Sequence, residues 1–205
     1  MSPRSISLVK VGGSLLDWPE LPAQLDRFLE QRRVSAPETL DVLLCGGGPF
    51  VDSVRRLDRV HHLGDYMAHR LAIQAMDLAS AVLLCMLHGA MGVESVESLH
   101  GEWPADDIPI LIPSVILQEL EEIQASPLPQ SWDVTSDTIA AWIAGQLKAE
   151  SLVLLKSASL PPNPTRDVAA RLKLVDPFFP LISSGVAQVE YLNLRDPSAT
   201  AQILP

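Results

Sequence analysis

The stretch SISLVKVGGSLLDW, residues 5–18, places a lysine inside an apolar run that ends in two glycines. Residues 6–11 are mostly isoleucine, leucine and valine, which is typical of a buried strand. The pair Gly12-Gly13 interrupts this run before a new segment begins. An ammonium group is rarely buried unless another group pairs with it, so Lys10 requires a counter-charge from elsewhere in the chain.

Apolar runs of this kind alternate with helical segments along the rest of the chain. Continuous Val, Ile and Leu strands that alternate with helices are typical of a parallel sheet covered on both faces. We therefore predict an α/β fold with a mainly parallel sheet. The predicted strands are 6–11, 40–45, 108–112, 151–156 and 186–194, and the predicted helices are 19–33, 48–61, 64–83, 115–123, a capped helix that begins near 135–136, 166–173 and 177–183.

The composition restricts the classes of ligand that this chain binds. Its 205 residues are 47% hydrophobic, which is enough for one substantial domain. With 25 acidic against 15 basic residues, the net charge of −10 argues against a nucleic-acid-binding surface. A local pocket for a small anionic substrate is still compatible with this charge.

The sequence predicts neither a secretory leader nor a membrane span. No basic start with an apolar core and a small-residue cleavage site is present, and no apolar run reaches the roughly 18 residues of a spanning helix. Cys45 and Cys85 each lie in an apolar run, which favours buried, reduced thiols in a reducing compartment. We therefore expect a cytoplasmic protein without a membrane partner.

Two predicted strands end in glycine-rich turns. In open α/β sheets, ligands bind outside the carboxyl ends of the strands. Residues 10–14 and 45–48 form two such ends, and residues 155–157 form a third. Glycines let backbone N–H groups approach a ligand, and the helix start that follows favours anions. The pattern predicts phosphate or carboxylate groups bound between these turns, although tight strand-to-helix turns without a ligand remain an alternative.

The positions of the lysines support an anion site. The chain has only four, Lys10, Lys148, Lys156 and Lys173. Lys148 and Lys173 fall near predicted helix C-termini, where the helix dipole favours a cation without any further role. Lys10 and Lys156 each end an apolar strand, and snorkelling towards solvent does not explain two matching cases.

The segment VTSDT, residues 134–138, offers a counter-charge for both strand lysines. Thr135 or Ser136 is predicted to cap the following helix, which places Asp137 in its first turn. If this helix points its N-terminus at the same sheet edge, the carboxylate approaches both lysines and completes a charge cluster around a polyphosphate. The alternative is that Asp137 is only a common first-turn acid.

Several other nucleotide and metal motifs are missing. The sequence contains neither G-x-x-x-x-G-K-[ST] nor G-x-G-x-x-G. Asp65 stands at the distance of a ribose-binding acid beyond Gly46, but it begins a helix, which disfavours a nicotinamide-dependent oxidoreductase. The five histidines lack close metal-ligand spacing, so no metal site made by protein side chains is predicted.

Three motifs, VKVGGSLL (9–16), GGGPFVDSVR (46–55) and WDVTSDTIAAWIA (132–144), together resemble the amino acid kinase family. A fourth, AHRLAIQAMD (68–77), is similar to a pattern in the archaeal-type subgroup that phosphorylates aminomethylfuran methyl phosphate in methanofuran synthesis. The resemblance covers roughly residues 6–156 and holds in both the order and the spacing of the motifs.

This resemblance implies a single three-layer α/β/α sandwich over residues 1–205, with an acceptor half of about 1–130 and a shortened nucleotide half of about 131–205. It implies a homo-oligomeric kinase that uses ATP and Mg²⁺ and transfers the γ-phosphoryl group to a small molecule. A phosphate or carboxylate acceptor fits two anion-binding turns that face each other, and the subgroup suggests synthesis of a methanofuran-type C1 carrier.

The resemblance also implies roles for individual residues. Lys10 would stabilise charge on the transferred phosphoryl group, and Asp137 would orient Lys10 and Lys156. The implied nucleotide-binding residues are Gly12, Gly13, Ser14, Lys156 and Ser157, and the implied acceptor-binding residues are Gly46, Gly47 and Gly48.

Three residues close to the second glycine turn are further candidates for the acceptor side. We predict that Asp52, Arg55 and His69 line it, with Arg55 as the best anion clamp because its guanidinium can engage two oxygens at once. A solvated helix face is the alternative explanation for Arg55.

The C-terminal third departs from the family pattern. The segment SASLPPNPT, residues 157–165, stands where the family has an Asp-Gly turn, and Ala199 precedes Thr200 where the family has Gly-Thr. A proline-rich loop offers few backbone donors, so we predict weak nucleotide binding through the polyphosphate, with little discrimination between ATP and GTP. The alternative function is a non-catalytic, kinase-like ligand-binding or regulatory protein with a degenerate nucleotide site.

Overall fold

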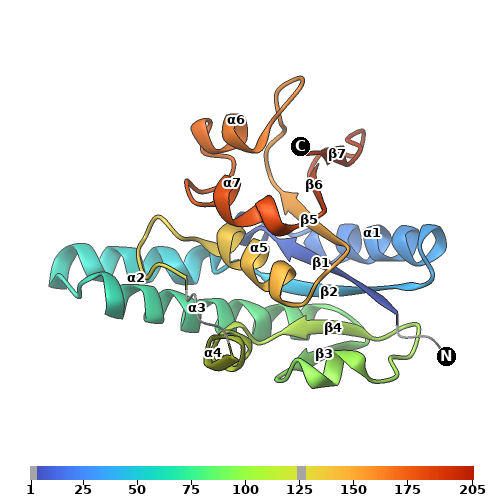
Figure 1. Cartoon of the computed structure of the whole chain (residues 1–205), viewed down its shortest axis with the longest axis horizontal. Helices are drawn as coiled ribbons and strands as arrows, with labels where there is room; N and C mark the ends of the chain where they lie inside the picture. The colour runs from blue at the N-terminus through green and yellow to red at the C-terminus, as the bar shows by residue number, and fades with distance from the viewer. Residues whose placement is uncertain (1–3, 124–127) are drawn as a thin grey trace.

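The computed structural model describes residues 4–123 and 128–205 (Figure 1). Helices and strands alternate over most of the chain, as the sequence predicts. In chain order they are β1 (Ser5–Val11), α1 (Leu21–Ser35), β2 (Thr39–Cys45), α2 (Gly48–His61), α3 (Asp65–Met86), β3 (Ala90–Val93), β4 (Ile108–Leu111), α4 (Pro113–Ile123), α5 (Ser136–Gln146), β5 (Ser151–Lys156), α6 (Arg166–Arg171), α7 (Phe179–Ile182), β6 (Gln188–Asn193) and β7 (Gln202–Ile203).

All of these strands belong to one seven-stranded sheet in the order β3-β4-β2-β1-β5-β6-β7. Every neighbouring pair is parallel except β6 and β7, which are antiparallel. The predicted mainly parallel sheet is therefore confirmed. The sequence does not predict β3 or β7, because β3 (AMGV) lacks a run of large, buried apolar residues and β7 has only two residues, both exposed.

Alternation of side chains along the strands divides the core into two layers. Val9 and Leu43 pack with α1 and α3 on one face of the sheet. Leu8 and Leu154 pack with α4, α5 and α7 on the other face. The structure therefore confirms the three-layer α/β/α sandwich that the family resemblance implies.

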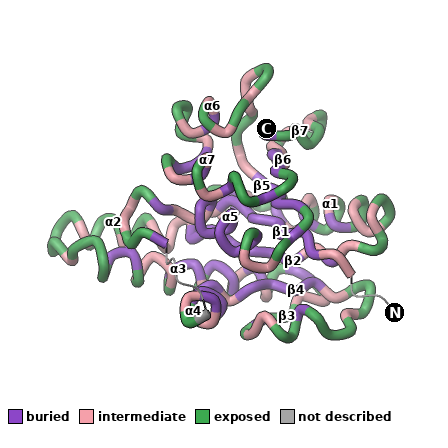
Figure 2. Tube along the Cα trace, viewed as in Figure 1, coloured by how far each residue is buried: buried purple, intermediate pink, exposed green. Residues whose placement is uncertain are grey.

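Helix α5 is the most enclosed of the covering helices (Figure 2). All eight residues from Asp137 to Ala144 are buried. Ala140, Ala141 and Ala144 keep this helix narrow, so it can lie close to β1 and β5. The burial of α5 brings its polar N-terminus to the carboxyl ends of the two strands that carry Lys10 and Lys156.

Helix α3 has the length and the mean hydropathy, 1.2 over 18 residues, that would also suit a membrane-spanning helix. The sequence predicts no membrane span because that expectation depends on uninterrupted apolar runs. Arg70 and Asp77 interrupt the apolar residues of α3. Core helices of globular proteins meet the same criteria, and Ala79 and Leu83 pack α3 against the sheet.

The two cysteines differ in environment. Cys45 at the end of β2 is buried and unpaired, as predicted. The prediction that Cys85 is buried is wrong, because this unpaired cysteine is exposed. Residues two positions apart on a helix point to different sides, so Leu83 faces the sheet while Cys85 faces away from it.

Candidate active site

The two predicted glycine turns open at the same edge of the sheet. Strands β1 and β2 are parallel neighbours, and Val11 pairs with Cys45 at their carboxyl ends. The backbone N–H of Gly46 donates to the carbonyl of Val11 at 2.9 Å, which joins the two turns directly. The predicted meeting of residues 12–13 and 46–48 is therefore confirmed.

Close packing between the turns explains why glycine stands at two of these positions. A Cβ atom on Gly13 would lie only 2.2 Å from the backbone nitrogen of Gly48. Gly48 itself has φ of +50°, a left-handed conformation that side chains disfavour. Tight turns alone, the alternative to a ligand site, therefore explain why Gly13 and Gly48 are glycines, whether or not a ligand binds there.

We expect Gly13→Ala to destabilise the protein by about 1–3 kcal/mol, because the added methyl group meets backbone that cannot rotate away. Gly145→Ala is the matched control, since nothing lies within 4 Å of a Cβ atom at that position inside α5. The control should gain up to about 1 kcal/mol from helix propensity. Urea unfolding measures both changes, and an unchanged Gly13→Ala variant would contradict the close packing.

The same turns line a cavity of about 450 Å³. Within residues 4–123 and 128–205, the backbone N–H groups of Gly13, Ser14, Gly47 and Gly48 have no hydrogen-bond acceptor. All four residues line the cavity. Unpaired backbone amides in glycine-rich turns at a helix start are donors that can bind phosphate and carboxylate groups.

The cavity has a polar side and an apolar side. The predicted acceptor residues Asp52, Arg55 and His69 all line it. Burial lowers the pKa of His69, which keeps its imidazole neutral at physiological pH. The apolar side is formed by Val51, Ala72, Ile73, Met76, Trp132, Val134 and Ile139.

Arg55 lies against Trp132 in the cavity wall. Its guanidinium lies 5.2 Å from the ring centre of Trp132, and its Nη1 donates to Asp52 at 3.1 Å. The side chains of Arg55 and Asp52 are 44% and 71% exposed, so this ion pair is weak and can yield to a ligand anion. Trp132 also lines the cavity.

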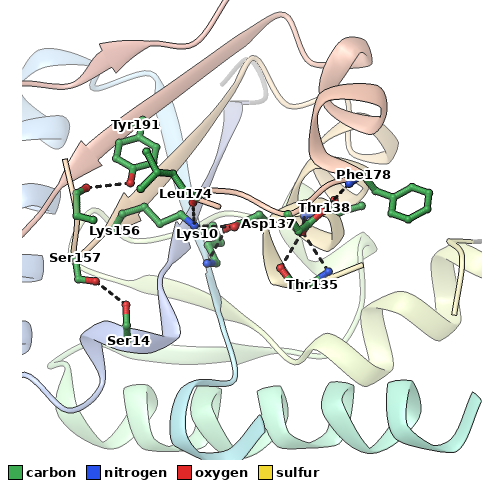
Figure 3. Close-up of polar contacts among 12 residues, drawn as sticks. Lys10, Ser14, Thr135, Asp137, Thr138, Lys156, Ser157, Leu174, Phe178 and Tyr191 are labelled. Atoms are coloured by element: carbon green, nitrogen blue, oxygen red, sulfur yellow. Dashed lines mark hydrogen bonds and ion pairs between the residues drawn. The ribbon is translucent and has the colours of Figure 1, made fainter. Parts of the chain in front are cut away.

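Behind the cavity, Asp137 lies between the two strand lysines (Figure 3). Side-chain alternation turns Lys10 and Lys156 towards α5, on the same face as Leu8 and Leu154. The Nζ atom of Lys10 lies 2.8 Å from Oδ1 of Asp137, and the Nζ atom of Lys156 lies 2.6 Å from Oδ2. The predicted contact of one carboxylate with both lysines is confirmed.

The pKa values of this cluster indicate that its carboxylate stays ionised. Burial alone would raise the pKa of Asp137, but the charges of Lys10 and Lys156 outweigh it and hold the pKa at about 2. Burial lowers the pKa of Lys156 to about 8, with Asp137 opposing part of that effect. With both lysines protonated the cluster carries one net positive charge, which suits an anionic ligand.

The cluster and the cavity are neighbouring but separate. The residues that line the cavity include Gly13, Ser14 and Ser136, whereas Lys10, Asp137, Lys156, Gly12, Gly46 and Ser157 lie outside its wall. A Cβ atom on Gly46 would sit 3.3 Å from Cε of Lys10 and 2.8 Å from Oγ of Ser136. Lys10 therefore lies next to Gly46, which adjoins the lining residues Gly47 and Ser136.

The site contains residues that sequence reasoning missed. Arg195, which follows β6, lines the cavity and donates from Nη2 to the carbonyl of Ser14 at 2.8 Å. Ser14 itself is a predicted nucleotide-binding residue, as is Ser157. Their hydroxyl oxygens lie 2.8 Å apart, which links the first turn to the end of β5. No periodicity or motif singles out Arg195 in the sequence, because its position depends on how the C-terminal strand packs.

The prediction that Thr135 or Ser136 caps α5 is confirmed in position by Thr135, but no side-chain bond from this residue caps the helix. Thr135 occupies the N-cap position, but its hydroxyl donates to Asp176 instead of accepting from the helix. The carboxylate of Asp176 accepts from the backbone N–H of Thr138 at 3.0 Å and so takes over the capping role. A buried aspartate from a distant segment gives no local sequence signal as a cap.

The described residues do not form a protein cage for Mg²⁺. Among residues 4–123 and 128–205, no three His, Cys, Asp or Glu side chains converge as metal ligands. Both oxygens of Asp137 already face ammonium groups. This donor set fits an anion and does not fit a directly bound divalent cation.

Comparison with known proteins agrees with this geometry. Residues 5–160 match the model of the amino acid kinase family. A curated relative, (5-(aminomethyl)furan-3-yl)methyl phosphate kinase of Methanocaldococcus jannaschii, is 28% identical over 148 residues, which cover 72% of this chain and 63% of the relative. The chain thus spans less than two thirds of the length of that relative.

Solved structures with a similar fold include UMP kinases. The enzyme from Ureaplasma parvum superposes with a TM-score of 0.62 at 13% identity, over 96% of this chain and 92% of that one. The enzyme from Bacillus anthracis gives 0.61 at 12% identity, over 99% and 100%. At such identities the likeness establishes the fold, and it extends through the C-terminal third where the sequence resemblance fades.

The family model covers well over half of the chain, the curated relative is a kinase, and the two solved structures with a similar fold are UMP kinases. This protein belongs to the amino acid kinase family.

Proposed function

We propose that this protein is a small-molecule kinase that transfers the γ-phosphoryl group of ATP to a phosphate- or carboxylate-bearing acceptor. The observation that carries the proposal is a pair of lysines, with side chains 4% and 13% exposed, held by one carboxylate beside a cavity where four backbone amides lack an acceptor within the described residues. Phosphoryl transfer is catalysed almost entirely by positioning and by stabilisation of charge on the transferred group, and these residues supply both.

In this proposal Lys10 is the cation that contacts the transferred phosphoryl group. Its ammonium has three N–H donors, and Asp137 engages it from one side at 2.8 Å. Asp137 keeps its negative charge at neutral pH, so it orients the two lysines and does not act as a proton carrier. Lys156 and Ser157 would face the nucleotide side, together with the turn formed by Gly12, Gly13 and Ser14.

The cavity wall suggests the kind of acceptor. Its polar side, with Arg55 and the amides of Gly47 and Gly48, suits an anionic group, while its apolar side with Trp132 suits a flat, weakly polar body. The name of the curated relative describes an acceptor of that type, a furan ring bearing a methyl phosphate. We propose an acceptor of this class, which would fit the synthesis of a methanofuran-type C1 carrier.

The donor side is proposed to be incomplete compared with the family. ATP would be held mainly by its phosphates, and Mg²⁺ would be carried by those phosphates, since the described residues offer no cage for it. The residues after β5 include Pro161, Pro162 and Pro164, which supply no backbone donors.

We further propose that the chain consists of an acceptor half of about 1–130 and a nucleotide half of about 131–205. We also propose that it forms a homo-oligomer. A cytoplasmic location is proposed as well, which is consistent with two unpaired cysteines.

A transfer assay with γ-labelled ATP, magnesium and a panel of phosphate monoesters and carboxylates tests this function. We expect transfer to a phosphate-bearing ring compound, with GTP serving as donor at a similar rate. Arg55→Gln should raise KM for the acceptor about 10- to 100-fold, because a charge-assisted contact is lost, and should change kcat little.

Arg56→Gln is the matched control, since this neighbouring arginine is exposed on α2 and does not line the cavity. Equal effects of the two substitutions would remove Arg55 from the acceptor site. Binding of ATP or of an acceptor without any transfer would favour the alternative, a kinase-like protein that holds its ligand without catalysis.

A further inference from the structure

A short segment beyond the family match reaches the ion cluster from the C-terminal third. Residues 174–176 lie after α6, outside the matched residues 5–160. The carbonyl oxygen of Leu174 accepts a hydrogen bond from Nζ of Lys156 at 2.8 Å (Figure 3). Lys156 is therefore held at two points, by Asp137 on α5 and by the backbone of this segment.

The same segment holds the N-terminus of α5 through Asp176. Its Oδ2 atom accepts from Thr135, at 3.2 Å from the backbone nitrogen and 2.8 Å from the hydroxyl, and from the backbone N–H of Thr138 at 3.0 Å. Its Oδ1 atom accepts from the hydroxyl of Thr138 and from the backbone N–H of Phe178. Asp176 is only 6% exposed, so these bonds are shielded from water.

These contacts flank Asp137 on both sides along the helix. Thr135 precedes it and Thr138 follows it, and each is tied to the same carboxylate. No side chain of α5 caps its own N-terminus, so Asp176 is the group that fixes the first turn. A shift of that turn would move Asp137 relative to Lys10 and Lys156, because the two lysines are anchored on β1 and β5.

We propose that residues 174–176 are a positioning segment, in which Asp176 sets the place of Asp137 and the Leu174 carbonyl sets the place of Lys156. The catalytic consequence rests on the proposed kinase function, whereas the positioning itself is a property of the folded protein. A segment with no counterpart among the family motifs therefore completes the cluster, and the C-terminal third contributes to the site even though its nucleotide motifs have changed.

The test uses nitrogen-15 NMR of the lysine ammonium groups in the full chain, which has only four lysines to assign. In mildly acidic buffer, we expect the ammonium protons of Lys10 and Lys156 to exchange slowly with water, while those of the exposed Lys148 and Lys173 exchange rapidly. Asp176→Asn should make the Lys156 protons exchange at least about tenfold faster, because the amide cannot accept from all of these donors.

Asp77→Asn is the matched control. Asp77 also accepts the first-turn N–H of another helix, Ser114 of α4, at 2.9 Å, but it lies outside the cavity and the cluster. We expect this variant to lose stability without changing the exchange at Lys10 or Lys156. If Asp176→Asn does not fold, Thr138→Val removes one hydroxyl donor to Asp176 and should produce a smaller increase at Lys156.

The positioning role would be overturned if Lys156 exchanged at the wild-type rate in a folded Asp176→Asn variant. If that variant cannot be studied, a wild-type rate in a folded Thr138→Val variant would overturn it. So would an equal change in Asp77→Asn. If the wild type transfers phosphoryl groups, Asp176→Asn should lower kcat more than it raises KM. If the wild type shows no transfer, the kinase proposal fails, and the exchange measurements still decide the positioning role.

Discussion

Asp137→Asn is expected to destabilise the protein by about 3–5 kcal/mol, the largest effect we predict for a single substitution. The carboxylate is 6% exposed and lies within 2.8 Å of two ammonium nitrogens. Replacing it with a neutral amide leaves the ammonium groups of Lys10 and Lys156 facing each other without a counter-charge between them. Urea unfolding followed by tryptophan fluorescence measures the loss, and ligand binding should fall with it because both lysines lose their orientation.

Asp133→Asn is the control for this change, since Asp133 is exposed four residues earlier and undergoes the same loss of charge. It should alter stability by less than about 0.5 kcal/mol. If Asp137→Asn cannot be purified, the double variant Asp137→Asn, Lys156→Met removes one of the unpaired cations and should recover part of the stability. An Asp137→Asn protein as stable as wild type would show that the cluster is not held by this carboxylate.

The pH dependence of stability follows from the same residue. The pKa of Asp137 is about 2 in the folded state and 3.8 as its ordinary value, so the folded state binds this proton more weakly than the unfolded state. The stabilisation, about 2 kcal/mol, is fully present above pH 3.8 and disappears as the pH falls towards 2. The Asp137→Asn variant lacks this contribution. The difference in the free energy of unfolding between variant and wild type should therefore become smaller as the pH falls from 3.8 towards 2.

Lys10→Met is expected to lower kcat about 10²- to 10³-fold while the protein remains folded. This is the range observed when one donor to a developing charge is removed, and Lys10 lies next to Gly46, with its Cε atom 3.3 Å from the position of a Cβ atom there. Stability should stay within about 1 kcal/mol of wild type, because Asp137 keeps Lys156 as a partner and methionine fills a similar volume. Initial rates with ATP and the acceptor, together with urea unfolding, measure the two quantities.

The control is Lys148→Met, since this lysine is exposed just beyond α5 and contacts neither the cluster nor the cavity. It should leave both kcat and stability unchanged. The opposite behaviour of Asp137→Asn and Lys10→Met, one unstable and the other stable but inactive, distinguishes the residue that orients the cluster from the residue that contacts the phosphoryl group. A Lys10→Met enzyme with wild-type kcat would contradict the proposed role of Lys10.

The sequence by itself determined the layers of the fold and the meeting of the three charged residues. Apolar strands separated by helices impose a parallel sheet, and in a parallel sheet the carboxyl ends of neighbouring strands share one edge. Side-chain alternation then turns Lys10 and Lys156 to the same face, and a first-turn aspartate on the covering helix lies opposite them. Each step depends on local periodicity, which is present in the order of the residues.

Only the tertiary structure decided which distant groups complete the site. Asp176 as the cap of α5, the Leu174 carbonyl on Lys156 and Arg195 in the cavity wall all come from the C-terminal third. None of them repeats with a helical or strand period, and each acquires its role through one contact across the fold. Such contacts depend on the path of irregular segments between short elements, and that path is set by packing and hydrogen-bond satisfaction in three dimensions.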